Sequence, residues 1–165
     1  MAEKHRLQTI DFAAIYDRQF ARIYRVCFLY MKNRSDAEDA VSTVFLRLCE
    51  QKKPFASPEH ELAWLIVCAQ NVCKNELKRK HRSHLPLESA YDLADETTAD
   101  ETLPLLLALP EKYKAALYLY YYEGYPSVQV ARILGKKEST VRTWLAKGRA
   151  LLKAQLADEK GSDQP

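Results

Sequence analysis

Apolar side chains recur at steps of three and four residues near the start of the chain, which is the spacing of one face of an α-helix. Residues 10–32 carry the first stripe, made by Phe12, Ile15, Tyr16, Ile23, Val26, Cys27 and Tyr30. The polar stretch NRSDAED interrupts it, and there Ser35 and Glu38 have the spacing of a capping box that starts a second helix. The second stripe consists of Ala37, Ala40, Val41, Val44, Phe45 and Leu48. We therefore predict two amphipathic helices.

A third helix is predicted from about residue 58 to residue 83, and it has two distinct faces. Two prolines in QKKPFASPEHE break the apolar spacing, and Ser57 followed by Pro58 has the pattern of an N-cap and a first helical residue. The apolar face consists of Leu62, Leu65, Ile66, Ala69, Val72, Cys73 and Leu77. The polar face consists of Asn71, Lys74, Asn75 and Lys78. Such a face is usually solvated surface, but this one leads into the basic run KRKHR, which favours an anionic partner.

Helical spacing is lost over residues 85–102 and resumes at Leu103, so we interpret the interval as a linker. In the helix that follows, Pro110 marks the start and Gly124 marks the end as a left-handed C-cap. One face of this helix carries Tyr113, Leu117, Tyr120 and Tyr121. We expect a face of this kind to line the core or a groove, and a platform for stacking bases is the alternative.

The stretch VARILGKKESTVRTWLAKGR, residues 130–149, joins two helical patterns at a glycine. Val130, Ala131 and Leu134 would face inward on the first helix, and Gly135 can take a positive φ and turn the chain. The inward face of the second helix consists of Val141, Leu145, Gly148 and Leu152. Its outward face consists of Ser139, Arg142, Thr143 and Ala146, with Lys147 beside them. This pattern is typical of a helix-turn-helix, whose second helix enters the major groove of DNA; the alternative is a helical hairpin with a basic solvent face.

Length and charge narrow the class of protein. A chain of 165 residues with only four glycines suits an all-α fold of one compact domain or two small ones. The formal net charge of +3 is mild, but the charge is unevenly distributed. Residues 74–84 and 136–153 are strongly basic, whereas residues 88–101 carry carboxylates and no Lys or Arg. This layout predicts two anion-facing surfaces joined by a segment of opposite sign.

Several classes of protein lack support. The N-terminus has no apolar core of signal-peptide length, and no apolar run approaches the roughly 20 residues of a membrane helix, so we expect a cytoplasmic protein without membrane insertion. We expect Cys27, Cys49, Cys68 and Cys73 to be buried, reduced thiols, because they form no C-x-x-C pair and lie in apolar-rich stretches. No metal-ligand spacing and no Cys–His, paired-carboxylate or Gly-rich phosphate motif is present. We therefore expect no metal, no cofactor and no enzymatic activity.

Three segments, in their order, resemble the extracytoplasmic-function sigma factors, the minimal two-domain promoter-recognition subunits of bacterial RNA polymerase. SDAEDAVSTVFLRL resembles region two-two of that family, and ELAWLIVCAQNVCKNELKRKHR resembles regions two-three and two-four. The third segment resembles region four of the family and reads LLALPEKYKAALYLYYYEGYPSVQVARILGKKESTVRTWLAKGRALLK. The resemblance covers about residues 10–156 and implies two small helical domains, the second a helix-turn-helix. Region two would occupy residues 1–84, an acidic flexible linker residues 85–102, region four residues 103–158 and a disordered tail residues 159–165.

The resemblance also implies partners and contacts. The protein would bind core RNA polymerase, at the clamp helices of the largest subunit and at the flap, and promoter DNA; an anti-sigma factor is a further candidate partner. Clamp-helix contacts would come from Asp36, Glu38, Asp39, Val44, Phe45 and Arg47. The melted minus-ten element would be held by Asn71, Lys74, Asn75, Lys78, Arg79 and Arg82. The minus-thirty-five element would be read by Ser139, Thr140, Arg142, Thr143, Ala146, Lys147 and Arg149.

Three other functions compete with this interpretation. A free-standing helix-turn-helix regulator would explain the C-terminal part but gives Asn71 and the KRKHR run no role. Tight binding to duplex promoter DNA without polymerase would favour it. An adaptor whose basic faces bind acidic proteins is a further alternative, and salt-sensitive crosslinking to DNA within a polymerase complex would argue against it. An enzyme using Cys or His lacks every supporting motif.

Overall fold

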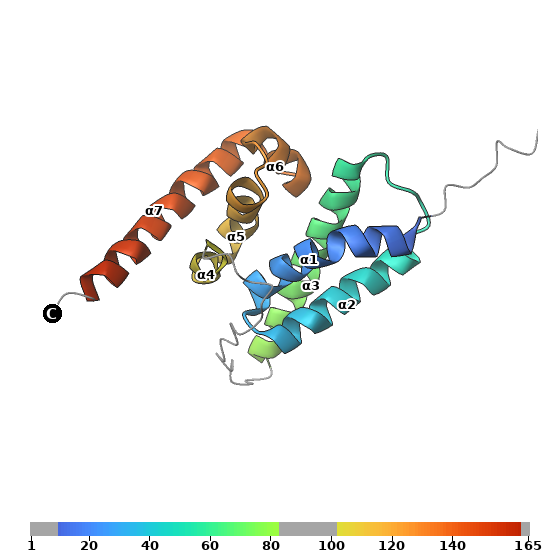
Figure 1. Cartoon of the computed structure of the whole chain (residues 1–165), viewed down its shortest axis with the longest axis horizontal. Coiled ribbons are helices and arrows are strands. Elements are labelled where there is room, and N and C mark those ends of the chain that lie inside the picture. The colour runs from blue at the N-terminus through green and yellow to red at the C-terminus, as the bar shows by residue number, and fades with distance from the viewer. Residues whose placement is uncertain (1–9, 83–101, 163–165) are drawn as a thin grey trace, which may run out of the picture. The chain divides into compact units, whose positions relative to one another are not determined.

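The computed structural model describes residues 10–82 and 102–162, and in these ranges every regular element is a helix. The elements are α1 (Phe12–Met31), α2 (Arg34–Glu50), α3 (Pro58–Arg82), α4 (Thr102–Leu107), α5 (Glu111–Leu117), the π-helical turn η3 (Tyr118–Tyr122), α6 (Ser127–Leu134) and α7 (Glu138–Ser162) (Figure 1). The prediction of an all-α fold is confirmed. The chain divides into two compact units, Met1–Ala90 and Tyr91–Pro165. Apart from Thr102, the predicted linker lies outside the described residues.

Helices α1, α2 and α3 pack against one another in the first unit, around an apolar core. Every residue of the predicted α2 stripe is buried, and the predicted α3 stripe is buried except for Leu77, which is half-buried. The α1 stripe needs a correction, because Phe12 and Tyr16 remain 36% and 38% exposed. They lie in the first turns of α1, where the ring of Phe45 contacts both of them, so α2 covers them only in part.

The start of α2 also differs from the prediction. Its N-cap is Asn33, whose side-chain oxygen accepts a hydrogen bond from the backbone N–H of Asp36 at 2.8 Å. Ser35 already lies inside the helix, and Glu38 pairs with Arg34 at 2.9 Å instead of closing a capping box. Asn and Ser are equally good N-caps, so the local pattern does not choose between them.

The start of α3 follows the prediction. Pro58 is its first residue, and the Ser57 hydroxyl accepts a hydrogen bond from the backbone N–H of His60 at 3.1 Å.

In the second unit, α5 begins after Pro110 as predicted, and Gly124 has a φ of +77°. Between them the helix widens into the π-turn η3, in which the backbone N–H of Glu123 donates to the Tyr118 carbonyl at 3.1 Å. A π-turn inserts an extra residue into the helical repeat, so the buried face shifts. Tyr118 belongs to a run, residues 113–119, in which every residue is buried, whereas Tyr121 is 43% exposed, which corrects the predicted tyrosine face.

Helices α6 and α7 form the predicted helix-turn-helix. Val130, Ala131 and Leu134 are buried, and Gly135 ends α6 in the left-handed conformation with a φ of +65°. The backbone N–H of Lys136 then donates to the Ala131 carbonyl at 2.9 Å, which closes the turn. Helix α7 continues through residues 159–162, so the prediction of a disordered tail from residue 159 is wrong there; residues 163–165 lie outside the described ranges.

Gly148 lets α7 approach α5 closely. A methyl group at this position would lie 2.2 Å from Leu117 Cδ1 and 3.1 Å from Leu117 Cγ. Leu117 is fully buried and cannot swing into solvent. By contrast, a methyl group at Gly161, near the end of the same helix, would meet nothing within 4 Å.

We expect Gly148→Ala to destabilise the second unit although alanine is the better helix former. Overpacking a well-packed site costs about 1–3 kcal/mol, and alanine recovers at most about 1 kcal/mol of helix propensity. Gly161→Ala, the matched control, should leave stability unchanged or slightly raised. Thermal unfolding of both variants measures the difference. The Gly148→Ala penalty should also shrink in a Leu117→Ala background; an equal penalty in both backgrounds would contradict the close-approach argument.

Candidate polymerase and nucleic-acid surfaces

The polar face predicted on the third helix lies on the surface of α3. Asn71, Lys74, Asn75 and Lys78 are all exposed, while Val72 and Cys73 between them are buried. The helix therefore presents amides and ammonium groups along one side and is held by its apolar side. This arrangement suits a strand of nucleic acid, because amides can hydrogen-bond base edges and lysines can bind phosphates.

The basic run at the end of α3 is divided between two roles. Arg79 is exposed and pairs with Glu76 on its own helix at 2.9 Å. Lys80 instead forms an ion pair with Asp36 on α2, and only about a fifth of its side chain is exposed (21%). Arg82 belongs to α3, but its side chain lies outside the described residues. The run is thus partly a contact between helices as well as a basic surface.

The residues predicted to contact polymerase fall into two groups on α2. Glu38, Asp39 and Arg47 are exposed. Val44 and Phe45 are both buried, Phe45 against the ring of Tyr16 on α1, so we remove both from the contact set. Their apolar character holds α2 in place, and a family motif does not distinguish such supporting residues from contacting ones.

Asp36 also has a structural partner. Burial raises the pKa of Asp36, but hydrogen bonds from Lys80 and Asn33 outweigh burial and hold the pKa below its ordinary value. The carboxylate is therefore ionised at neutral pH and ties the start of α2 to the end of α3.

Leu46 is a candidate contact that the sequence reasoning missed. Its side chain is 65% exposed, the most exposed of the large apolar side chains in the described residues. It follows Asp39 by seven positions and Ser42 by four, so all three lie on the same outward face of α2. The sequence does contain a signal for this contact. Leu46 is an apolar residue that does not belong to the buried stripe of α2, to which its neighbours Phe45 and Leu48 belong.

The outward face of α7 has the predicted composition. Ser139, Arg142, Thr143, Ala146, Lys147 and Arg149 are exposed, and Thr140 is half-buried. At about 100° per residue, Thr143 and Ala146 lie between Arg142 on one edge and Lys147 on the other. Arg142 approaches Glu138 at 3.9 Å, with 66% of its own side chain exposed. An exposed pair at that distance holds the guanidinium weakly, so it can turn to a new partner.

Two of the four cysteines offer little reactivity. Cys27, Cys68 and Cys73 are buried, but Cys49 is exposed, which corrects the prediction for that residue. A hydrogen bond with Cys73, together with burial, raises the pKa of Cys27 well above its usual value, and burial raises the pKa of Cys68. These two thiols stay protonated at neutral pH and are poor nucleophiles.

Within the described ranges no group of three His, Cys, Asp or Glu side chains could hold a metal ion. None of the described helices is long and apolar enough to cross a membrane.

Comparison with known proteins identifies similar sequences and folds. Residues 15–83 match the family described as Sigma-70 region 2, and residues 101–152 match Sigma-70, region 4. The ECF RNA polymerase sigma factor SigM of Mycobacterium tuberculosis is 30% identical over 146 residues, covering 86% of this chain and 74% of SigM. SigW of Bacillus subtilis is 26% identical over 167 residues, covering 89% of each chain. The sigma factor RpoE of Bartonella quintana, solved with the anti-sigma factor NepR, matches with a TM-score of 0.70 at 17% identity, over 89% of this chain and 97% of that chain.

Proposed function

The chain belongs to the extracytoplasmic-function sigma factors, and we propose how its two units share the work of promoter recognition. It is an alternative sigma factor, which binds core RNA polymerase and promoter DNA and directs transcription initiation. In our proposal residues 1–84 act as region two, residues 103–158 act as region four, and residues 85–102 connect them. Sigma factors are initiation factors, so we propose that this chain is not an enzyme and leaves bond formation to the polymerase.

The opened minus-ten element binds to α3 and to the α2–α3 loop (residues 51–57) in this proposal. The observation that carries it is the exposed row Asn71, Lys74, Asn75 and Lys78 on a helix whose opposite side is buried. An amide reads the pairing edge of a base only after the base has left the stack, so Asn71 contacts the flipped base. Lys74 and Lys78 lie one turn apart and bind phosphates, and Arg79 and Arg82 extend this path.

The minus-thirty-five element is read as duplex by the outer face of α7. Ser139, Thr143 and Ala146 approach the base edges, with Arg142 and Lys147 at the two sides of this face. Thr140 and Arg149 contact the DNA backbone, where charge and position matter more than base identity. The second unit also rests on the polymerase flap.

The outward face of α2 binds the clamp helices of the largest polymerase subunit. Glu38, Asp39 and Arg47 supply the polar contacts, and Leu46, two turns after Asp39 on the same face, supplies an apolar anchor. Interfaces commonly depend on a few apolar anchors that become fully desolvated, surrounded by polar contacts.

We expect Asp39→Ala and Leu46→Ala each to weaken binding to core polymerase by about tenfold or more, as removal of an interface anchor does. Both side chains are exposed, so helicity by circular dichroism should not change. Val67→Ala is the matched control, since it truncates an exposed apolar side chain on α3, which the proposal does not assign to polymerase. Fluorescence titration with core polymerase measures the affinities. Wild-type affinity of both α2 variants would place the polymerase contact elsewhere.

We also propose where the protein acts and that it has a third partner, in addition to polymerase and DNA. A protein that works on polymerase and chromosomal promoters acts in the cytoplasm. The fold is shared with a sigma factor solved in complex with its anti-sigma factor, and we propose a partner of that kind here as well.

One experiment separates this function from a free-standing helix-turn-helix regulator. Promoter duplex is titrated with the protein alone and with the protein bound to core polymerase. A sigma factor should bind tightly and selectively only together with polymerase, because the contacts of α3 require an opened strand. Tight, selective binding by the protein alone would favour the regulator.

A further inference from the structure

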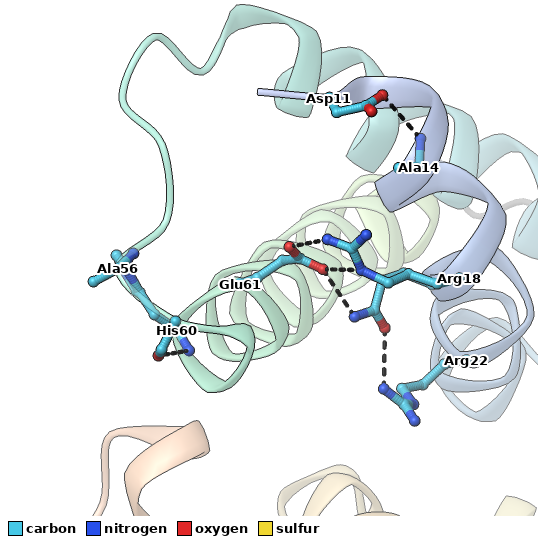
Figure 2. Close-up of polar contacts among 9 residues, drawn as sticks. Asp11, Ala14, Arg18, Arg22, Ala56, His60 and Glu61 are labelled. Carbon is cyan, nitrogen blue, oxygen red and sulfur yellow. Dashed lines mark hydrogen bonds and ion pairs between the residues drawn. The ribbon is translucent and has the colours of Figure 1, made fainter. Parts of the chain in front are cut away.

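The first turn of α3 is anchored to α1 by a buried carboxylate. The side chain of Glu61 is only 7% exposed, and it accepts hydrogen bonds from Arg18 Nε at 2.9 Å and Arg18 Nη2 at 2.5 Å (Figure 2). Gln19 Nε2 donates to the same carboxylate at 3.1 Å, and Arg22 donates to the Gln19 side-chain oxygen at 3.1 Å. Burial raises the pKa of Glu61, but the bonds from Arg18 and Gln19 outweigh it and lower the pKa below its ordinary value. The carboxylate is therefore ionised at neutral pH.

The end of the α2–α3 loop is fastened to the same turn. The backbone N–H of Glu61 donates to the Ser57 carbonyl at 3.0 Å. The backbone N–H of Ala56 donates to Nδ1 of His60 at 3.0 Å. The ring of Phe55 contacts the ring of His60 edge-on, with centroids 5.4 Å apart, and lies 5.8 Å from the ring of Trp64. Residues 55–57 thus take their shape from His60 and Glu61.

We propose that Glu61 and His60 are positioning residues, which hold the end of the α2–α3 loop in the shape that grips the unpaired minus-ten strand. The inference rests on the function proposed for α3 and this loop. His60 is exposed and adds nothing to the core, and its ring nitrogen bonds the loop backbone. Glu61 fixes the direction of that turn relative to α1. The alternative is that Glu61 only holds α1 and α3 together. A positioning role predicts a loss of promoter opening alone, whereas a purely structural role predicts that polymerase affinity and unfolding temperature fall as well.

The first test concerns His60 and uses a pair of variants. His60→Ala removes the acceptor for the Ala56 N–H and should lower promoter opening by about tenfold, the effect of losing one positioning hydrogen bond at a binding site. His60→Asn places an amide oxygen close to the position of Nδ1 and should restore most of the activity. Binding to core polymerase and the unfolding temperature should stay at wild-type values in both variants, since this side chain is exposed.

The second test concerns Glu61. Glu61→Gln keeps the shape of the side chain and removes its charge, so the bonds from Arg18 weaken. In the holoenzyme it should reduce opening of a closed promoter duplex by about tenfold, with a smaller loss on the same promoter carrying a mismatched minus-ten segment. Polymerase affinity should fall less than twofold. A parallel fall in polymerase affinity, unfolding temperature and opening would instead make Glu61 a purely structural contact and overturn its positioning role.

Asn71→Ala, assayed in parallel, separates this inference from the function on which it rests. All variants are tested in the full-length protein with core polymerase, on a promoter mapped with wild-type protein, and opening is followed with 2-aminopurine in the minus-ten segment. Impaired opening in Asn71→Ala, with wild-type opening in His60→Ala and Glu61→Gln, overturns the positioning inference alone. Wild-type opening in all three overturns both this inference and the proposed role of α3.

Discussion

Arg142→Ala should change which minus-thirty-five sequences the protein uses. Arg142 lies at the edge of the outer face of α7, near the start of the helix that, in the proposed function, enters the major groove. Among the described residues it has a weak contact with Glu138, at 3.9 Å. A guanidinium there can form a two-pronged contact with guanine. Losing such a contact costs about 1–3 kcal/mol of discrimination, which is roughly a 5- to 150-fold change in preference. Lys147→Ala should have a smaller effect on preference, because a lysine is a point charge without that geometry.

Arg149→Ala is the matched control on the same helix. We assign Arg149 to phosphate, so its removal should weaken all promoters alike and reduce the salt dependence of binding by about one unit of slope. Transcription from a promoter library at two salt concentrations, with all three variants, gives both quantities. An unchanged base preference and an unchanged salt slope in every variant would mean that α7 does not read the promoter.

Asn71→Ala should impair the opening of promoters rather than their first recognition. The amide is exposed in the middle of α3 and, in the proposed function, contacts a base that has left the duplex. Flipping a base costs a few kcal/mol, roughly, and contacts with the flipped base repay part of that cost. Without the amide, we expect transcription from a closed duplex to fall by about tenfold or more, with a relaxed preference at one minus-ten position.

A mismatched minus-ten segment should reduce this defect, because the strands are already separated. Asn75→Ala, one turn along the same face, is the comparison variant: it also removes an exposed amide of the minus-ten row, but one that we do not assign to the flipped base, so its loss should be smaller. Permanganate footprinting of closed and mismatched promoters measures opening directly. Equal losses on both templates, or equal losses in both variants, would contradict the assignment of Asn71 to the flipped base.

The sequence predicted most of the fold because burial in helices follows a simple period. The apolar stripe of α2 is buried as predicted. The helix-turn-helix forms around Gly135 as predicted, although Leu152 of its inward face is only half-buried. The exceptions have local physical causes. Residues 113–119 are buried on every side of the helix, so a stripe at helical steps does not distinguish Tyr118 from its neighbours, and the π-turn from Tyr118 to Tyr122 has no signal in the apolar spacing.

The candidate sites were less predictable, because they depend on contacts between distant residues. The exposed polar row of α3 followed from spacing alone. No local pattern shows that Glu61 is buried, since its partner Arg18 lies 43 positions away in the chain. Phe45 and Leu46 are likewise neighbours in the family motif, and the motif does not show that Phe45 is buried against α1 while Leu46 is exposed to solvent.

Sequencing the transcription starts on fragmented host DNA tests the central claim most directly. Core polymerase is supplied with and without the protein, and the starts that depend on the protein are aligned. The account predicts a set of such starts that share one element near minus ten and a second near minus thirty-five at a fixed spacing, because one chain carries a reader for each. Protein-dependent starts with no shared upstream sequence, or no protein-dependent starts at all, would contradict it.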